Sequence, residues 1–360
     1  MKIRHLLPLA LMFAFIAPLP AEPLRVLVAG MSHGHVTGFF KDADPAVVTV
    51  VGVWEPDATI WAKYAGEPRL AGVRHYVDLE EAVANSGAQA VWAFSDTKTH
   101  LQVVRAAAPH RLAVIVEKPL SISWADAKTI AGLANRYHTL VLTNYETSWY
   151  PAFWDTQRMI ADGTLGPVRQ IDVQMGHQGP VKIGVPPEFM SWLIDPSRGG
   201  AGALYDFGCY GANVATWWDG NRAPTSVAAQ TYTFDPADYP HCDDHAVIEL
   251  IYPDHQVTVT ASWHWTFGRK DAAIYGEKGA IITSDSRNYL VRNGRGESQA
   301  HVAKSAPRSP LLWFAEAIRD RRDPVDDPAS LANNLIVMKI LDAARLSAAE
   351  HRTVQLSEFN

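Results

Sequence analysis

The chain has 360 residues, which is enough for two domains that each bury a core. Hydrophobic residues make up 48% of the sequence and charged residues 19%, a balance that excludes an intrinsically disordered chain. The net charge is −6 and the basic residues are scattered along the sequence, so we expect no nucleic-acid partner.

Residues 1–21 are predicted to form a secretory signal peptide. A basic start precedes an apolar stretch, and the small residue Ala21 offers a cleavage site. The stretch is short and interrupted by prolines, so it does not suit a membrane span, and we expect no membrane association once it is removed. The sequence therefore predicts a periplasmic or secreted protein, with a cytoplasmic location as the alternative. Cys209 and Cys242 would then be paired or free, and the sequence leaves both states open.

Residues 24–143 are predicted to form a doubly wound, parallel Rossmann sheet of the α/β class. Apolar runs rich in β-branched residues alternate with segments of helical period, and these runs occupy residues 25–30, 47–55, 89–95, 112–119 and 139–146. Near-continuous apolar runs are typical of strands buried on both faces, and the helical segments between them supply the crossovers of a parallel sheet. Such a layout is typical of dinucleotide-binding domains.

The pattern of apolar residues changes after residue 143. Residues 144–300 are predicted to form an α+β domain with a large, open, mostly antiparallel sheet, whose strands are expected within residues 164–177, 225–234, 245–253, 256–267 and 271–285. Glycine and proline mark the turns between these strands. Residues 310–350 have helical period and are expected to pack back on the body of the protein.

The turn after the first predicted strand matches two motifs. Gly30 to Gly34 contains the G-x-S-x-G string of a hydrolase nucleophile elbow, with Ser32 as the nucleophile. The same turn is a degenerate G-x-G-x-x-G dinucleotide loop, in which Ser32 replaces the second glycine and Gly34 falls one place early. An elbow needs an earlier strand to build its oxyanion hole, whereas a dinucleotide loop follows the first strand. The position favours a phosphate-facing loop, with cofactor contacts from Gly30, Ser32, His33 and Gly34.

Glu55 supports the dinucleotide interpretation. It ends the second predicted strand, 25 residues after Gly30, where such domains place an acidic residue. A carboxylate there accepts hydrogen bonds from the ribose hydroxyls and repels a 2′-phosphate, and no arginine adjoins it in the sequence. The sequence therefore predicts NAD as the cofactor in preference to NADP.

Two further segments resemble the glucose–fructose oxidoreductase, inositol dehydrogenase and MocA family. VIVEKPLS at residues 114–121 is similar to the Glu-Lys-Pro segment that follows the family's fifth strand. GGAGALYDFGCYGANVATWW at residues 199–218 is similar to its GG-x-G-x-L-x-D-x-G-x-(His/Tyr) segment. AFSDTKTH at residues 93–100 and ADGTLGPV at residues 161–168 also resemble family segments. The resemblance implies a Rossmann domain followed by an α/β domain whose open sheet often mediates homo-oligomerisation.

The resemblance also implies a catalytic group of Lys118, Asp206 and Tyr210. Lys118 follows a parallel strand, where it would orient a substrate hydroxyl and lower the pKa of a neighbouring acid–base group. Asp206 and Tyr210 are four residues apart, so we expect them on one helix face, with Tyr210 as the proton carrier. The unperturbed pKa of a tyrosine is about 10, which is too high for proton transfer near neutral pH, so we expect Lys118 to lower it. The structural alternatives are a surface ion pair for Lys118, a helix cap for Asp206 and core packing for Tyr210.

The other expected site residues are assigned more broadly. Ser95, His100, Glu117, Lys118 and Asn144 are expected near the cofactor, and the expected substrate contacts are Trp149, Trp192 and His264. We expect no metal site. The run at residues 241–245 contains histidine, cysteine and aspartate, but alternate residues of a strand point to opposite faces. His33 and His35 flank the cofactor loop, where a phosphate-facing role is favoured over metal binding.

Three functions are compatible with these residues. The first is an NAD-dependent oxidoreductase that moves hydride between nicotinamide and a sugar, polyol or related cyclic alcohol. The second uses NAD as a catalytic redox group to cleave glycosides by oxidation, elimination and reduction. The third is a dinucleotide- or sugar-binding protein without turnover. Net NADH formation, glycoside cleavage without net NADH, or ligand binding alone would distinguish them.

Overall fold

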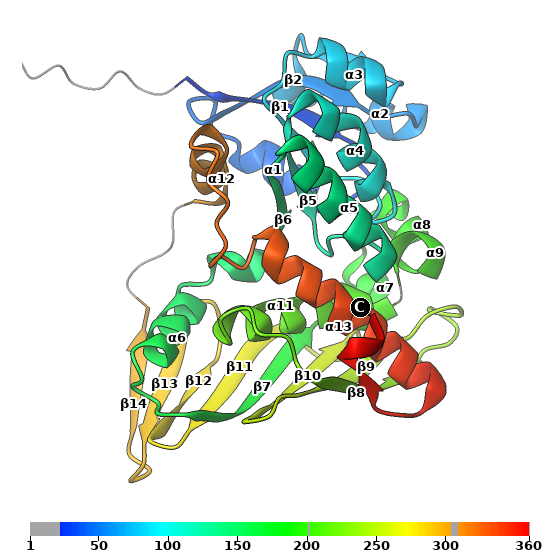
Figure 1. Cartoon of the computed structure of the whole chain (residues 1–360). Helices are drawn as coiled ribbons and strands as arrows, with labels where there is room; N and C mark the ends of the chain where they lie inside the picture. The colour runs from blue at the N-terminus through cyan, green and yellow to red at the C-terminus, as the bar shows by residue number, and fades with distance from the viewer. Residues whose placement is uncertain (1–21, 201, 304–308, 360) are drawn as a thin grey trace, which may run out of the picture.

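The computed structural model of the chain describes residues 22–200, 202–303 and 309–359. The predicted signal peptide, residues 1–21, lies outside the described residues. Two sheets form the two halves of the molecule, and the long helix α13 (Leu331–Glu350) lies between them (Figure 1). Within the part of the chain that the structure describes, no helix is long and apolar enough to cross a membrane.

The first half contains a six-stranded parallel sheet. Its strand order is β3 (Arg74–Tyr76), β2 (Val48–Trp54), β1 (Leu24–Ala29), β4 (Ala90–Ala93), β5 (Ala113–Glu117) and β6 (Val141–Asn144). The helices that follow its strands are α1 (His35–Asp42), α2 (Ala58–Tyr64), α3 (Leu79–Asn85), α4 (Thr99–Ala107) and α5 (Trp124–Tyr137). This order, with helices on both faces, is the doubly wound dinucleotide-binding arrangement, so the predicted fold class is confirmed.

The strands of this sheet are apolar along their whole length because both faces are covered. Every residue of β4 and β5 is buried, and β1 exposes only Arg25. Local signals set the helix ends: the Ser123 side chain accepts a hydrogen bond from the Asp126 N–H at the start of α5, and His138 ends that helix in the left-handed conformation. The sheet is therefore a rigid frame whose strand ends position polar side chains.

The second half contains a nine-stranded sheet. Its order is β14 (Ser298–Val302), β13 (Asn288–Asn293), β12 (Gly279–Thr283), β11 (Arg269–Gly276), β7 (Val168–Gly176), β10 (Gln256–Ser262), β9 (His245–Ile251), β8 (Ser226–Tyr232) and β15 (Val354–Gln355). Only the pairing of β7 with β10 is parallel, so the prediction of a mostly antiparallel sheet is confirmed.

Helices cover one face of the large sheet and join it to the first half. They are α6 (Pro151–Ala161), α10 (Gly202–Asp206), α11 (Gly208–Trp218) and α13, and every residue of α11 is buried. Two shorter helices, α8 (Pro187–Leu193) and α9 (Pro196–Gly199), contact the first half, whereas α7 (Pro180–Ile183) contacts the loop between β8 and β9. The helix α12 (Pro310–Arg319) packs on that sheet through Phe314, whose ring lies 5.2 Å from the ring of Trp92.

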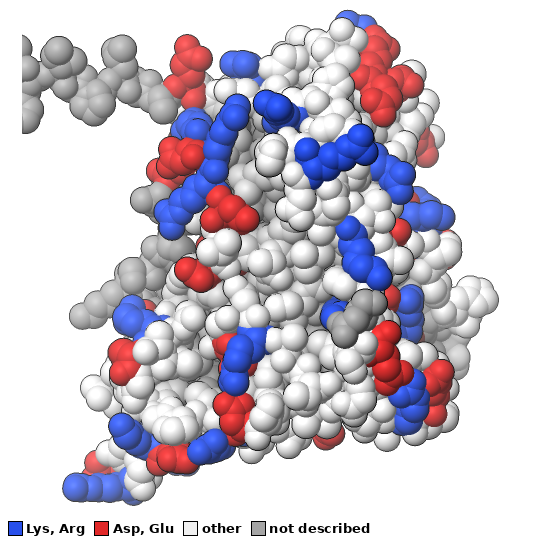
Figure 2. Space-filling view, in the orientation of Figure 1, with Lys and Arg blue, Asp and Glu red and all other residues white. Residues whose placement is uncertain are grey.

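Two apolar cores result from this arrangement. One lies between α1, α12 and one face of the parallel sheet, and the other runs from the opposite face of that sheet to the large sheet. Lys and Arg side chains are interspersed with Asp and Glu side chains over the face shown in Figure 2. The scattering of charge along the sequence is therefore also present on this part of the surface.

Candidate active site

The carboxyl ends of the parallel strands bring most of the predicted site residues to one edge of the first sheet. The turn after β1 carries Gly30 to Gly34, β2 is followed by Glu55, and β4 leads to Ser95. β5 ends at Glu117 and is followed by Lys118, while β6 ends at Asn144. This is the edge at which doubly wound sheets bind their ligands.

Gly30 is required by the geometry of the turn. Its φ is +77°, and a Cβ added to it would lie 2.8 Å from Cβ of Ser95 in the turn after β4. The backbone N–H of His33 then donates to the carbonyl oxygen of Phe94 at 2.8 Å. This hydrogen bond joins the turn after β1 to the turn after β4, and it fixes the start of α1 relative to β4.

Glu55 lies where a ribose-binding acid is expected. Its carboxylate accepts hydrogen bonds from the N–H groups of Met31 at 2.8 Å and Asp57 at 3.0 Å, and the residue is only 3% exposed. Burial raises the pKa of this carboxyl, against the two backbone hydrogen bonds. Each oxygen retains acceptor capacity beyond these bonds. The chemistry of this donor set, with the tight glycine turn beside it, fits the adenosine end of a dinucleotide.

Helix α8 lies over the start of α1. The ring of Phe189 is 4.7 Å from the ring of His33, and a Cβ on Gly34 would lie 3.2 Å from the Phe189 ring. Glu188 forms an ion pair with Lys63 of α2. Trp192, predicted as a substrate contact, is buried and packs on Phe189 with 4.9 Å between ring centroids. It also lines a small hollow that contains Lys118 and Asp206.

Lys118 and Asp206 form a buried ion pair across the two halves of the protein. The second carboxylate oxygen of Asp206 accepts a hydrogen bond from Trp263 Nε1 at 2.9 Å. Burial opposes the charged form of both groups, but the attraction between them raises the pKa of Lys118 and lowers the pKa of Asp206. Both side chains are therefore charged at neutral pH, and Asp206 fixes the position of the lysine.

Asp206 and Tyr210 do not share a continuous helix, which corrects the expectation of one helix face. α10 ends at Asp206 and α11 begins at Gly208, with Phe207 as its N-cap residue. The four-residue spacing still brings both residues to Lys118, whose Nζ lies 5.1 Å from the ring centroid of Tyr210. Close packing requires glycine at the first residue of α11, because a Cβ on Gly208 would lie 2.9 Å from the Ile248 side chain.

The expected lowering of the Tyr210 pKa is also wrong. Burial raises the pKa of this phenol well above its usual value, and the Glu146 carboxylate adds to the effect. Lys118 does not reverse this shift because its charge is paired with Asp206. Lys270 Nζ lies 4.9 Å from the ring centroid of Tyr210, and it is paired with Glu146. Tyr210 is therefore flanked by two lysine–carboxylate pairs and stays protonated.

Glu117 and Asn144 meet at the ends of β5 and β6. Asn144 Nδ2 donates to the Glu117 carboxylate at 3.0 Å, and Trp149 Nε1 donates to Asn144 Oδ1 at 3.2 Å. The ring of Trp149 also packs on Phe314 of α12 at 5.5 Å. The hydrogen bond therefore brings Trp149 to this edge of the sheet, while its ring belongs to the apolar core.

The two remaining predicted histidines lie in different places. His100 is buried, with Nδ1 facing the carbonyl oxygens of Pro119 at 3.2 Å and Leu120 at 3.3 Å. His264 Nε2 lies 2.9 Å from the carboxylate of Asp244, in the loop network of the large sheet. His100 is thus beside the Lys118 segment, whereas none of the described contacts of His264 involves the catalytic group.

Several residues that line the cleft were not predicted from the sequence. A hollow of about 360 Å³ lies next to Tyr210, and its polar lining includes Glu146, Tyr150, His177, Arg269, Lys270 and Asp285. His177 Nδ1 accepts a hydrogen bond from the Gly179 N–H at 2.9 Å, and burial lowers its pKa. These residues come from β11 and from the segments that follow β6, β7 and β12. No motif links them in the sequence, although His177 is the last residue of a predicted strand segment.

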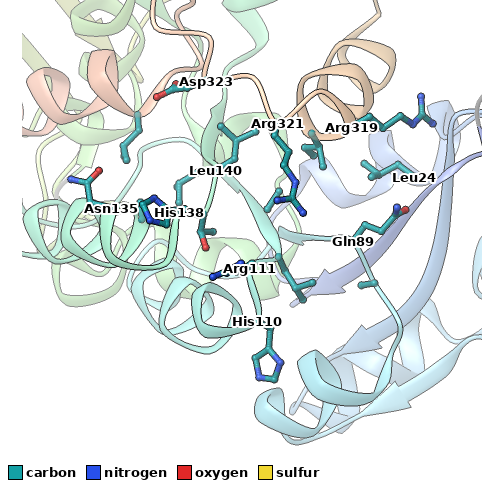
Figure 3. A pocket seen from close by; sticks show the side chains of 18 residues that line it. Leu24, Gln89, His110, Arg111, Asn135, His138, Leu140, Arg319, Arg321 and Asp323 are labelled. Carbon is teal, nitrogen blue, oxygen red and sulfur yellow. The ribbon is translucent and has the colours of Figure 1, made fainter.

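A second hollow and the two cysteines complete the description of the polar groups around the first sheet. A hollow of about 780 Å³ opens at the opposite edge of the first sheet, where β1 and β5 begin, and Arg111 and Arg321 line it (Figure 3). Cys209 and Cys242 are both free thiols, so the open question of a disulfide is answered. The hollow lies at the far edge of the sheet from Lys118, whereas the buried Cys209 thiol donates a hydrogen bond to the carbonyl oxygen of Asp206 at 3.3 Å.

Comparison with known proteins identifies the family. The model of the oxidoreductase family with an NAD-binding Rossmann fold matches residues 24–145, and the model of the GFO/IDH/MocA C-terminal domain matches residues 153–282. The chain is 25% identical over 322 residues to 1,5-anhydro-D-fructose reductase of Ensifer adhaerens, which covers 84% of this chain and 91% of that protein. It is 23% identical over 283 residues to trans-1,2-dihydrobenzene-1,2-diol dehydrogenase of Xenopus tropicalis, covering 75% and 81%.

The fold is also similar to that of solved structures. The crystal structure of an inositol dehydrogenase homolog from Azotobacter vinelandii, complexed with NADH and myo-inositol, matches with a TM-score of 0.78 at 17% identity. The match covers 93% of this chain and 98% of that one. The strand order, the Glu-Lys-Pro segment and the two family matches agree. The chain therefore belongs to the GFO/IDH/MocA family of oxidoreductases, with an NAD-binding Rossmann domain at its N-terminal side.

Proposed function

We propose that the protein is an NAD-dependent oxidoreductase that interconverts an alcohol and a carbonyl group of a sugar, polyol or related cyclic alcohol. The observation that carries the proposal is the buried Lys118–Asp206 pair beside Tyr210, at the carboxyl edge of the sheet that presents Glu55. The names of relatives that act on anhydrofructose and bind myo-inositol support this substrate class.

The cofactor contacts follow from the fit of the loop. Gly30, Ser32, His33 and Gly34 would face the phosphates, and Glu55 would accept the ribose hydroxyls. Glu117 and Asn144 end β5 and β6, Ser95 and His100 follow β4, and these four residues would face the nicotinamide side. When bound, NAD accepts or supplies the hydride. No arginine pairs with Glu55 among the described residues, which supports NAD over NADP.

The residues of the chain supply position and the proton. Lys118, held by Asp206, would donate a hydrogen bond to the reacting oxygen and so orient the substrate. Tyr210 would hold the proton that this oxygen gains or loses. Because the phenol stays protonated, its described state suits delivery of a proton to a carbonyl oxygen. Trp192 and Trp149 would form apolar walls of the cleft.

A panel of sugars and polyols incubated with NAD tests this proposal by the absorbance of NADH. We expect net NADH formation with at least one member and none with a Lys118→Met variant. Glycoside cleavage without net NADH would instead support the redox-assisted cleavage mechanism. If the protein binds nucleotide and sugar but catalyses neither reaction, the proposal that it is an enzyme is refuted.

We also propose a location and an assembly. Residues 1–21 would direct export, so the mature chain would begin at Glu22 in the periplasm or the medium, which N-terminal sequencing of each cell fraction tests.

The chain would form a homo-oligomer through the uncovered face of the large sheet, where Tyr232 and Tyr275 are exposed. Light scattering of the purified protein measures this directly, and a monomer at micromolar concentration would contradict it.

A further inference from the structure

The acidic pair Asp243–Asp244 has no role in the proposed function. It belongs to the run of residues 241–245 that leads into β9, and its two side chains bond to different segments. The Asp243 carboxylate accepts the backbone N–H of Leu204 at 2.7 Å. The Asp244 carboxylate instead accepts two backbone N–H groups of the loop after β8, at 2.9 Å and 2.8 Å. The first of these bonds leads directly to the buried ion pair.

Asp243 holds the start of the helix that ends at Asp206. Besides the side-chain bond to Leu204, its backbone carbonyl oxygen accepts the Ala203 N–H at 3.0 Å. The contact leaves no room for a side chain at Gly202, because a Cβ there would lie 1.8 Å from that carbonyl oxygen. Helix α10 has only five residues, little more than one turn, so a shift of its start moves Asp206 as well.

The residue next to Asp243 restrains the Asp206 carboxylate through an indole. The carbonyl oxygen of Asp244 accepts the Trp263 backbone N–H at 2.8 Å, and Trp263 Nε1 donates to Asp206 Oδ2 at 2.9 Å. The Trp263 side chain is completely buried and its ring packs on Tyr239 with 5.0 Å between centroids. The indole therefore has little freedom to turn, and it leaves Asp206 Oδ1 to Lys118.

We propose that Asp243 is a positioning residue for the Lys118–Asp206 pair. Its carboxylate places the backbone of Asp206, and the adjoining Asp244 carbonyl places the indole that holds one carboxylate oxygen. Both ends of Asp206 are thus restrained from one loop. The role of Lys118 toward the reacting oxygen rests on the proposed function, whereas the restraint on the pair exists without substrate. A displacement of about 1 Å in such a group can cost about 100-fold in rate.

The charge on Asp243 strengthens the restraint. A hydrogen bond from an N–H to a carboxylate is about twice as strong as one to a neutral acceptor. Burial raises the pKa of Asp243 to about 7, and the Asp244 carboxylate adds to this shift against the backbone hydrogen bonds. Measurements at pH 8 therefore keep the group charged. Asparagine at this position retains an acceptor oxygen for the Leu204 N–H, whereas alanine removes it.

Steady-state kinetics at pH 8, with a substrate that yields NADH, give the first readout. Asp243→Ala should lower kcat by about 10- to 100-fold and leave the dissociation constant of NAD unchanged, because the cofactor contacts lie in the other half. Asp243→Asn should recover most of the lost kcat. Asp78→Ala is the matched control: its carboxylate accepts the Glu81 N–H at 2.7 Å at the start of α3, so the variant loses a similar bond and should keep the wild-type kcat.

Chemical labelling of Lys118 gives a second readout that needs no turnover. Acetic anhydride reacts with uncharged amines, and mass spectrometry gives the rate at Lys118 relative to the exposed Lys41. Asp243→Ala should raise this ratio by about tenfold, as expected for a fall of about one unit in the Lys118 pKa when the pair loosens. Trp263→Phe, which removes the indole donor, should raise it too, and Asp243→Asn should stay near the wild-type ratio.

The outcomes separate this proposal from the proposed function. A folded Asp243→Ala variant with the wild-type labelling ratio would overturn the positioning role, whatever its kcat. Thermal melting identifies a variant that does not fold, and in that case Trp263→Phe is held to the same criterion. If no substrate yields NADH, the proposed function fails, and the labelling ratio alone decides whether Asp243 positions the pair.

Discussion

The ammonium group of Lys118 is paired with the carboxylate of Asp206, and both side chains are almost completely buried at the junction of the two halves. Lys118 follows β5 of the parallel sheet, and Asp206 ends α10 on the large sheet. The pair therefore joins the nucleotide-binding half to the substrate half. Its geometry depends on the docking of both halves, so stability and activity are linked at this point.

Removing one partner of this pair should destabilise the protein more than removing both. Lys118→Met or Asp206→Asn leaves an uncompensated buried group, which costs about 3–5 kcal/mol of unfolding free energy. The double variant Lys118→Met/Asp206→Leu should recover at least about half of that loss, while all three variants lack turnover. Urea unfolding measures the free energies. A double variant as unstable as the sum of the single variants would contradict the coupling.

Tyr210→Phe should abolish turnover and leave NAD affinity nearly unchanged. The phenol hydroxyl is the proposed proton carrier, and the ring that remains keeps the packing against Lys118 and Lys270. The comparison is made by steady-state kinetics and by calorimetric titration of NAD. Tyr145→Phe is the matched control, since the ring of Tyr145 packs on Tyr210 at 5.3 Å and its buried hydroxyl has no role in the proposed proton transfer. Full activity of the Tyr210 variant would remove this residue from the mechanism.

Glu55→Gln should weaken NAD binding by about tenfold, equivalent to about 1.4 kcal/mol, and should narrow the preference for NAD over NADP. Glutamine can still accept the Met31 N–H, so the turn is expected to keep its shape. Fluorescence titration with both nucleotides gives the two dissociation constants. Glu80→Gln, on the exposed face of α3, should leave both unchanged. An unaltered NAD affinity in the Glu55 variant would mean that the carboxylate does not contact the ribose.

Asp327→Asn should stabilise the protein above neutral pH. Burial raises the pKa of this carboxyl to about 7, against a hydrogen bond from the Ala329 N–H and the charge of Arg322. The folded state thus holds the proton more tightly than the unfolded state, whose pKa is about 3.9. Wild-type stability consequently falls as pH rises from about 4 to about 7.

The gain in unfolding free energy from Asp327→Asn should therefore be near zero at pH 4 and about 4 kcal/mol at pH 8, where the full difference between the two pKa values applies. Denaturant unfolding at several pH values measures it. Asp326→Asn, at an exposed neighbouring position, is the control and should show no such trend. A gain that is constant with pH would show that the carboxyl is not titrating in this window.

The parts of the site that were predictable are those set by local sequence. Gly30 and Glu55 follow from the succession of strand, tight turn and helix, because the chain direction alone brings both to one edge of the sheet. Lys118 follows in the same way from the end of β5. Its pairing with Asp206 was not fixed by any local pattern, because that carboxylate lies 88 positions later in the chain.

The parts that were not predictable depend on tertiary packing. The break between α10 and α11 falls inside a segment of continuous helical period, and the buried side chain of Ile248 that crowds Gly208 belongs to a strand some forty residues later. The placement of α8 over the start of α1 rests on Phe189 and Glu188, in a segment without a strong period. The contact of His35 with Glu117 spans 82 positions. No short-range signal specifies such contacts.

The direct test of the central claim is the identity of the bound nucleotide. The protein lacking residues 1–21 would be purified and denatured, any released nucleotide would be identified by mass spectrometry, and the refolded or nucleotide-free protein would be titrated with NAD. We expect NAD to be released, or to bind in titration at about one molecule per chain, with NADP binding more weakly. Absence of a released nucleotide together with no detectable NAD binding would contradict the assignment of this protein as an NAD-dependent oxidoreductase.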